Sequence, residues 1–307
     1  MAGLALFVVR RLLGIAALVW LATLATFGLF HVGVPNRAAD AQITAQLGPG
    51  QPLTGQYLHY LARLLHGDLG QSLTQGLSVD ALLGRALPPT LSLMIGGLVL
   101  WLAIGVAAGI VSALRPGSLA DRVITGSTLT AMIVPTFLTA LLLLELSAYL
   151  NRSGLLWLQS GYVPITHNPG AWLGRMVLPW IAVAATQAGL TARITRSAIL
   201  DVLGEDYIRM ARAKGVDQRR ILVRHVLRPA IIPVITTAAA GFGTLLGAAA
   251  IVDQTFALNG IGQALLTAVK SGDLMTIMGT VLITVILICL ASLLADLAQK
   301  MLDPQVA

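Results

Sequence analysis

Six long segments without a charged residue constrain the fold of this chain more than any other feature. They cover residues 12–30, 86–114, 123–144, 176–192, 229–252 and 274–295. A helix needs about 20 predominantly apolar residues to cross the hydrocarbon core of a bilayer. The fourth segment is the shortest, but Arg175 and Arg193 flank it, and their long stems can reach the membrane interface. We therefore predict an all-α, polytopic membrane protein with six transmembrane helices.

The composition supports a single membrane domain over residues 1–307. Charged residues make up 11% of the chain and apolar residues 56%, whereas about a quarter of the residues in a soluble domain are charged. The net charge of +7 does not indicate nucleic acid, because the basic residues lie between apolar segments and not on the polar face of a soluble core. The single cysteine, Cys289, excludes a disulfide within the chain. We expect the lipid bilayer, and no nucleic acid, as a partner.

The basic residues also predict the orientation in the membrane. Six crossings place both termini on one side. Most arginines and lysines fall on that side: Arg10, Arg11, Arg115, Arg122, Lys300 and the nine within residues 193–228. Short loops rich in Lys and Arg stay in the cytoplasm. Both termini and residues 193–228 are therefore expected to be cytoplasmic, and residues 31–85 to be extracytoplasmic.

The extracytoplasmic segment 31–85 is the longest connection between spans. It is too short, and too polar at its start, to form a second globular domain. Within it Leu58, Leu61, Leu64 and Leu65 follow helical spacing, which predicts one amphipathic stripe. We therefore expect a loop that contains one short helix.

The cytoplasmic loop 193–228 contains more than the few basic residues that orientation requires. Residues 205–214 are acidic at the start and basic at the end, as the helix dipole favours. Gly215 follows, where a helix commonly ends in a left-handed residue, and Asp217 can cap a second helix. The pattern predicts a helix, a tight break and a second helix that runs to Pro229.

This loop carries a resemblance to a known family. Residues 205–215, EDYIRMARAKG, resemble the EAA loop of permease subunits of ABC-type importers. The ARAKG core is typical of the dipeptide, oligopeptide and nickel branch, although Arg209-Met210-Ala211 replaces the general Glu-Ala-Ala triplet. Other matching positions are Arg11-Leu12-Leu13, Gly67-Asp68-Leu69-Gly70, Leu87-Pro88 and Asp303-Pro304. Over nearly its whole length the chain resembles the first, B-type, permease of dipeptide importers.

The resemblance implies a type I ABC importer permease fold in the bacterial cytoplasmic (inner) membrane. In such importers a second, homologous permease completes the translocation pathway, two ATPase subunits or domains supply the energy, and an extracytoplasmic binding protein delivers the substrate. The EAA loop forms a coupling helix that docks in a groove of the ATPase. Its residues in this chain are Glu205, Asp206, Tyr207, Arg209, Met210, Ala211, Arg212, Ala213, Lys214 and Gly215.

The chain contains no Gly-x-x-x-x-Gly-Lys-Ser/Thr phosphate loop, so the energy must come from a partner. We expect ATP and magnesium to be bound by the ATPase subunits, and we expect neither a cofactor nor enzymatic activity in this chain. The resemblance implies dipeptides or oligopeptides as cargo. Nickel, haem and glutathione remain alternatives within the same family.

Six residues within or beside the predicted spans are candidates for the translocation pathway. An acidic group in a span is expensive and marks a functional candidate, although it can also reach water at the headgroup level. Proline and glycine can kink helices or permit close contacts around a cavity, but they can equally serve packing alone. The family has a glutamate where this chain has an aspartate near the end of the fifth span. The candidates are Pro135, Glu145, Gly241, Gly243, Gly247 and Asp253.

Two other classes of membrane protein fit the sequence less well. An ion-driven secondary transporter usually needs ionisable groups near the middle of the membrane, and here such groups lie near the ends of the spans. An intramembrane enzyme needs clustered catalytic groups, and no span combines a histidine with a serine or holds paired acids. The five histidines also lack the i, i+4 spacing of a helical metal site, so no metal site is expected.

Overall fold

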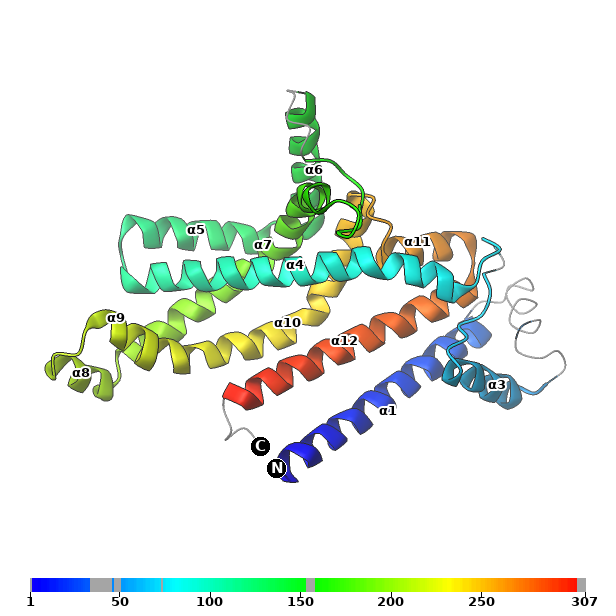
Figure 1. The fold of residues 1–307 in the computed structure, drawn as a ribbon, viewed down its shortest axis with the longest axis horizontal. Coiled ribbons are helices and arrows are strands. Elements are labelled where there is room, and N and C mark those ends of the chain that lie inside the picture. The colour runs from blue at the N-terminus through cyan, green and yellow to red at the C-terminus, as the bar shows by residue number, and fades with distance from the viewer. Residues whose placement is uncertain (1, 34–45, 47–50, 73, 153–157, 303–307) are drawn as a thin grey trace. The chain divides into compact units, whose positions relative to one another are not determined.

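The computed structural model describes residues 2–33, 46, 51–72, 74–152 and 158–302. The named elements within these ranges are all helices, which confirms the all-α prediction. The motif residues Asp303-Pro304 lie outside the described residues. The helices (Figure 1) are α1 (Ala2–Gly33), α3 (Leu53–Leu65), α4 (Val79–Leu114), α5 (Leu119–Ile133), α6 (Thr136–Arg152), α7 (Pro169–Leu203), α8 (Asp206–Ala213), α9 (Gln218–Ile221), the π-helical turn η1 (Leu222–Val226), α10 (Leu227–Thr255), α11 (Ile261–Ser271) and α12 (Leu274–Leu302).

Five of the described helical stretches are long and apolar enough to cross a membrane. They belong to α1, α4, α7, the continuous stretch from α9 to α10, and α12. The pair α5 and α6 passes the same test together, and it brings the number to six when the bent pair is counted as one span. Five of the six predicted spans thus fall in single helices of suitable length and composition, and the third falls in this bent pair.

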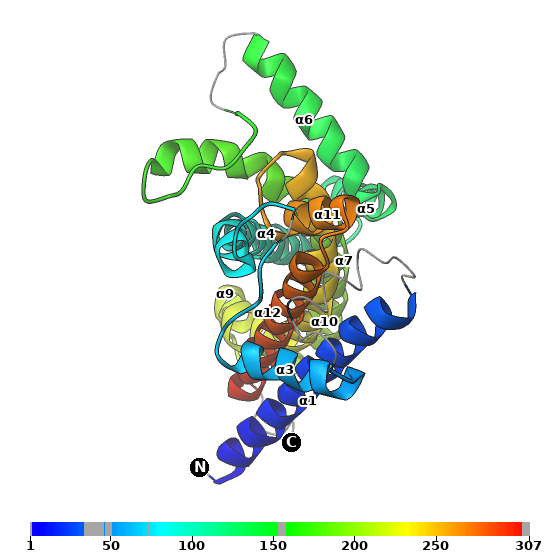
Figure 2. The ribbon, with the colours of Figure 1, turned by 90° about the vertical axis from the view of Figure 1, so that its right-hand side faces the viewer.

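The third predicted span is not one continuous helix. Helices α5 and α6 meet at an angle of 105°, and Figures 1 and 2 both show α6 turning away from the line of α5. Val134 has an extended backbone at the break, with φ −71° and ψ 120°. Pro135 causes this, because the ring of a proline disfavours the helical conformation in the residue before it. The sequence predicted one span over residues 123–144, with Pro135 as a candidate for a kink, and predicted neither the break nor its angle.

Helix α7 is much longer than the predicted fourth span of residues 176–192. It runs for 35 residues, or about 50 Å at 1.5 Å per residue, whereas a bilayer core is about 30 Å thick. Asn168 caps its first turn by accepting the N–H of Ala171 at 3.0 Å, and Pro169 occupies the first helical position, where its missing N–H costs nothing. The additional turns at the other end extend into the loop of residues 193–228.

The chain forms two compact units, and the first comprises residues 1–91 and 257–290. Its core contains buried side chains from α1, α3, α4 and α12: Phe27, Tyr60, Val79, Leu83, Leu274, Met275 and Met278. Asp273 is fully buried and accepts hydrogen bonds from the hydroxyl groups of Ser72, Thr74 and Thr276. These bonds fix the segment before α4 to the start of α12.

Helix α3 is the short helix expected in segment 31–85, and its buried face shares only part of the predicted leucine stripe. Tyr57 and Tyr60 face the core, with ring centroids 5.2 and 6.3 Å from that of Phe27. Leu58 and Leu65 are exposed. Leu64 packs against the same core, so the leucine stripe is confirmed in part. The large aromatic rings of Tyr57 and Tyr60 lie on this face as well, because they bury much surface against α1.

The turn after α3 is held by local contacts. Arg63 donates two hydrogen bonds to the carboxylate of Asp68, at 2.8 and 3.0 Å, and these bonds hold the pKa of Asp68 below its usual value. Gly70 has a φ of +96°, a conformation that glycine adopts without steric cost. The Gly67-Asp68-Leu69-Gly70 motif therefore serves the shape of this turn.

The second unit comprises residues 92–256 and 291–307, and α7 is central to it. Helices α5, α6 and α10 each pack against α7. Helix α4 approaches α7 at glycines: a Cβ atom on Gly105 would lie 2.7 Å from the Cβ of Thr191, and one on Gly109 2.5 Å from the Cβ of Thr195. Small residues permit such close contacts between membrane helices.

Candidate functional site

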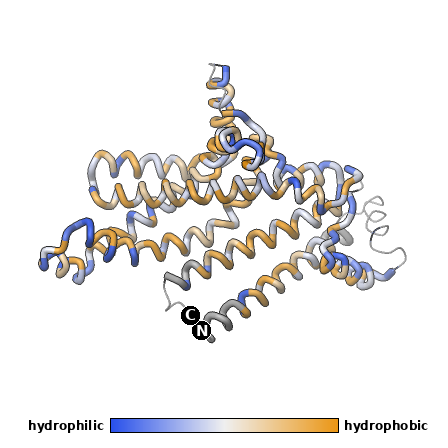
Figure 3. Tube along the Cα trace, in the orientation of Figure 1, coloured by the Kyte–Doolittle hydropathy of each residue, from blue (hydrophilic) through white to orange (hydrophobic). Residues whose placement is uncertain are grey.

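The loop that the sequence predicts to be cytoplasmic begins at the end of α7 and leads back into α10, with α8 and α9 between them. Figure 3 shows hydrophilic residues gathered around α8 and α9, between the apolar lengths of the neighbouring helices. Helix α8 follows Glu205, which has an extended backbone. Asp206 lies in its first turn and Arg212 in its last, as the helix dipole favours. These bounds confirm the short helix predicted for residues 205–214.

The break after α8 also has the predicted geometry. Gly215 has a φ of +75°, in the left-handed region that glycine occupies most readily. The N–H of Val216 bonds to the carbonyl oxygen of Ala211 at 3.2 Å. Asp217 then accepts two N–H groups of the first turn of α9. These local hydrogen bonds thus fix the turn between α8 and α9.

Helix α8 is attached to the ends of the neighbouring helices by one side chain that the sequence analysis did not single out. Ile208 is fully buried, whereas the residues before and after it are exposed. It belongs to a core cluster formed by Ala113, Ile199, Ile208, Ile221, Val226 and Ala230. Ala211, at i+3 from Ile208, packs against the same cluster. This i, i+3 spacing was the signal in the sequence that could have identified the buried face.

The other predicted coupling residues form the outer surface of α8. Ala211 is partly buried, and the remaining ones are exposed: Glu205, Asp206, Tyr207, Arg209, Met210, Arg212, Ala213, Lys214 and Gly215. Tyr207 and Met210 are large apolar or aromatic side chains, 44% and 57% exposed. Arg209 and Asp206 form an exposed ion pair at 3.5 Å, of a kind that contributes little to stability. The surface therefore combines apolar contact area with charge.

The sequence predicted that the second helix of the loop ends at Pro229, but in the structure the helix continues beyond this residue. Helix α9, the π-helical turn η1 and α10 form one stretch from Gln218 to Thr255. Pro229 lies in the first turn of α10, where a proline is tolerated. In a regular α-helix the carbonyl oxygen of His225 would accept the N–H of residue 229, but Pro229 has no N–H. The Tyr207 hydroxyl lies 3.5 Å from this oxygen. A π-helical turn next to the proline lets the helix continue.

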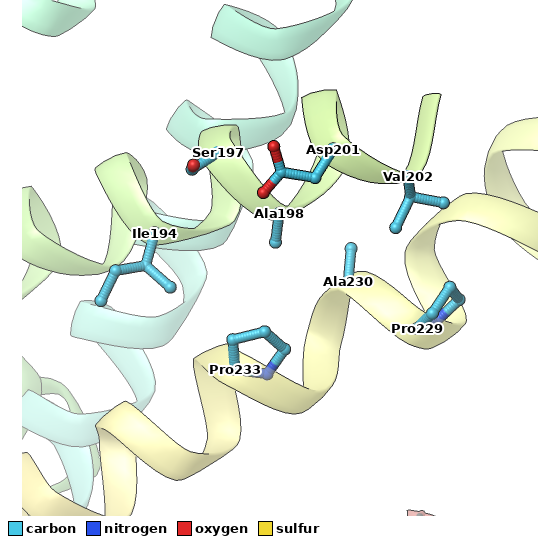
Figure 4. Close-up of a pocket in the computed structure, with 8 residues that line it drawn as sticks. All are labelled: Ile194, Ser197, Ala198, Asp201, Val202, Pro229, Ala230 and Pro233. Atoms are coloured by element: carbon cyan, nitrogen blue, oxygen red, sulfur yellow. The ribbon is translucent and has the colours of Figure 1, made fainter. Parts of the chain in front are cut away.

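A groove of about 390 Å³ lies between the last turns of α7 and the first turns of α10 (Figure 4). Ala198 and Ala230 point toward one another across it. Its lining is mainly apolar, with one carboxylate and one hydroxyl: Ile194, Ser197, Ala198, Asp201, Val202, Pro229, Ala230 and Pro233. The small side chains and prolines leave this space beside the loop.

The structure distributes the predicted pathway residues over α6, α10 and the break before α6. Pro135 lies at that break, and Glu145 is exposed on α6. Asp253, in the last turn of α10, is only 3% exposed. The six candidates therefore do not converge on one point.

The three glycines of α10 differ in their surroundings. A Cβ atom on Gly241 would lie 2.7 Å from Nε2 of Gln187 and 2.8 Å from Cη2 of Trp101. Around Gly243 and Gly247, no atom of the described residues beyond their own helix and its immediate neighbours lies within 4 Å of such a Cβ. Gly241 is thus a packing position, whereas the other two lie on an open face.

The open face of α10 consists of small and polar residues. The exposed positions follow helical spacing: Thr236, Ala240, Gly243, Thr244 and Gly247. Gln187 of α7 borders this face, because its Nε2 donates to Oγ1 of Thr244 at 2.8 Å. Helix faces in contact with lipid are usually apolar, so this composition suits a contact with another helix or with water. The sequence analysis missed Gln187, although a polar residue within an apolar run is a visible signal.

Comparison with known proteins identifies the family. Residues 105–307 match the family described as binding-protein-dependent transport system inner membrane component. The chain is 30% identical to a probable peptide ABC transporter permease protein of Sinorhizobium fredii, over 98% of each chain. It is 32% identical to the dipeptide transport system permease protein DppB of Escherichia coli, again over 98% of each.

A solved structure supports the fold. The chain is similar to a chain of the inward-facing MetNI methionine ABC transporter, with a TM-score of 0.56 and 21% identity, over 72% of this chain and 96% of the other. This likeness shows the fold of an ABC importer permease, which agrees with the helices described above. The chain belongs to the family of binding-protein-dependent transport system inner membrane components, as a multi-pass protein of the bacterial inner membrane.

Proposed function

We propose that this chain is one of two permease subunits of an ATP-driven importer of dipeptides or oligopeptides. The observation that carries the proposal is α8, a short helix that is anchored by Ile208 at the cytoplasmic ends of the spans and exposes nearly all its other side chains. Such a helix offers a contact surface to a cytoplasmic partner. The peptide cargo is supported by the names of the relatives in Sinorhizobium fredii and Escherichia coli.

In this proposal α8 is the coupling helix that docks on an ATPase subunit, which binds ATP and magnesium. Met210 and Tyr207 supply the apolar contact and the charged residues around them the polar rim, an arrangement common at protein interfaces. Ala213, exposed near the end of α8, would lie close to the partner. A second, homologous permease and its ATPase complete the assembly, and an extracytoplasmic binding protein delivers the substrate.

The open face of α10 is the proposed lining of the translocation pathway. Gly243 and Gly247 leave space for a substrate, and Gly241 sets the contact between α10 and α7. Pro135 and Asp253 lie at ends of helices that bound this region of the second unit. The reason for including Glu145 among the pathway residues is its charge within an otherwise apolar helix.

The test is reconstitution of the complete importer in proteoliposomes, with ATP inside and loaded binding protein outside. We expect ATP-dependent uptake of a labelled dipeptide or tetrapeptide, and none when this chain is omitted or when a non-hydrolysable ATP analogue replaces ATP. The purified chain alone should hydrolyse no ATP above an empty-liposome control. Uptake of nickel, haem or glutathione in place of peptides would change the cargo, and uptake driven by an ion gradient without ATP would contradict the proposal.

A further inference from the structure

An ion pair joins α5 to the last turns of α7, between the buried Asp121 and Arg196, whose side chain is 33% exposed. The Nε and Nη2 atoms of Arg196 donate to the two carboxylate oxygens of Asp121, at 2.9 and 3.0 Å. Asp121 is only 5% exposed. The Ser112 hydroxyl donates to one of its oxygens and the N–H of Gly117 to the other, at 2.8 Å. Charge-assisted, two-pronged pairs of this kind have a defined geometry as well as strength.

The pair connects three elements at one point. Ser112 belongs to the last turn of α4, Gly117 to the connection between α4 and α5, and Asp121 to the first turn of α5. Arg196 belongs to the length of α7 beyond the predicted span. The cytoplasmic ends of α4 and α5 are therefore both fastened to α7.

A second contact holds α5 against α7 further into the membrane. A Cβ atom on Gly189 would lie 2.7 Å from the carbonyl oxygen of Thr128 and 3.1 Å from Cγ of Met132. The break at Val134 and Pro135 follows immediately. Helix α5 is thus fixed to α7 at two points, whereas its continuation α6 departs at 105°.

The same part of α7 leads directly to α8. Ile199, one turn after Arg196, is fully buried and packs in the cluster that contains Ile208. Gly204 joins the two helices, and its N–H bonds back to the carbonyl oxygens of Leu200 and Asp201. Arg196 therefore lies between the surface of α8 and the start of the bent pair α5 and α6.

We propose that Asp121 and Arg196 are a positioning pair that makes α5 follow movements of α8, so that docking of α8 on its partner reaches the bend between α5 and α6. The inference rests on the proposed function, because it assumes that α8 receives the movement. Without Arg196, the buried carboxylate of Asp121 loses its compensating charge. A lysine at position 196 keeps the charge but cannot provide the two-pronged contact.

The experiment compares Asp121→Asn, Arg196→Lys and Arg196→Gln in the reconstituted importer. Arg122→Gln is the matched control, because Arg122 follows Asp121 in the same turn and its side chain is exposed. Three quantities are measured: recovery of the assembled complex, ATP hydrolysis, and substrate molecules imported per ATP hydrolysed. The surface of α8 is unchanged, so assembly and hydrolysis should persist. Import per ATP should fall by about 5- to 150-fold, the usual range of coupling between two sites, with Arg196→Lys retaining more than Arg196→Gln.

Three outcomes would overturn the inference: unchanged import per ATP in all three variants, an equal loss in the Arg122→Gln control, or failure of the variants to assemble at all. The last result would assign the pair a role in folding alone. The parent importer separates this inference from the proposed function. If the parent imports no peptide, the proposed function fails. The pair is then tested by the number of molecules imported per ATP for the substrate that the parent does import.

Discussion

Glycine decides how closely α4 and α7 can approach one another. Gly105 and Gly109 are four residues apart and face Thr191 and Thr195 across the contact. Beside them Trp101 is fully buried and donates from its indole N–H to the hydroxyl of Thr191 at 2.6 Å. Lipid chains are as apolar as leucine, so membrane helices associate through close packing and hydrogen bonds of this kind.

Gly109→Ala should therefore destabilise the protein. Its new methyl group would lie 2.5 Å from Cβ of Thr195 and 2.7 Å from the carbonyl oxygen of Ala192. The second atom belongs to the backbone and cannot move without separating the helices, and overpacking of this type costs about 1 to 3 kcal/mol. Thermal unfolding of the purified protein in detergent should shift to lower temperature.

Gly126→Ala is the control for this prediction. Gly126 lies within α5, and no atom of the described residues outside its own stretch of helix lies within 4 Å of a Cβ placed there. Alanine is favoured over glycine in a helix by about 1 kcal/mol, so this variant should be neutral or slightly more stable. Equal losses in both variants would show that the α4–α7 contact does not depend on glycine at position 109.

Single residues also show how far the sequence can be interpreted. Gly215 and Asp217 were predicted correctly, because a left-handed helix end and an N-cap depend on the few residues around them. The pair of Asp121 and Arg196 was not predicted, because its members are 75 positions apart in the chain. Nothing local to either residue indicates its partner.

Helix α8 depends on its packing more than on its own sequence. It has eight residues, and isolated helices shorter than about 12 to 15 residues are marginal in water. Its defined position must then come from Ile208 and Ala211 in the cluster with α7, α9 and α10. The charges at its ends help to orient it but are exposed to solvent.

Ile208→Ala should loosen α8, and Met210→Ala should not. Truncation of a fully buried isoleucine costs about 2 to 5 kcal/mol, whereas Met210 is 57% exposed. Limited trypsin digestion of the purified chain should cleave faster after Arg209 and Arg212 in Ile208→Ala than in the parent. Met210→Ala should be cleaved at the parental rate, although it removes a side chain proposed to contact the ATPase. Identical digestion of both variants would contradict the anchoring role of Ile208.

The spans illustrate the same limit for whole helices. Long uncharged segments identify where helices cross the membrane, because the cost of a charge in lipid is a property of each segment alone. They do not define where α7 ends, since its last turns pack against α4, α8 and α10 outside the apolar segment. The angle between α5 and α6 likewise depends on what each helix contacts, and Pro135 determines only its location.

The whole molecule combines the predicted spans with a polar loop that carries α8 and α9. Family membership places the protein in the bacterial inner membrane, and the positive-inside rule predicts α8 in the cytoplasm and α11 outside. The cargo could not be predicted from the residues alone, because no span carries side chains specific to one substrate class. The proposed transport function requires that α8 contacts an ATPase subunit in the cytoplasm.

Site-directed photocrosslinking tests this claim most directly. In a Cys289→Ser background, Ala213→Cys places a thiol at the exposed end of α8, and Ser271→Cys places one at the exposed end of α11. In membranes that contain the whole importer, a thiol-attached photocrosslinker at position 213 should capture the ATPase subunit, and one at position 271 should not. A membrane-impermeant thiol reagent should label only position 271 from outside. Labelling of position 213 from outside, or capture of the ATPase from position 271 and not from 213, would contradict the account.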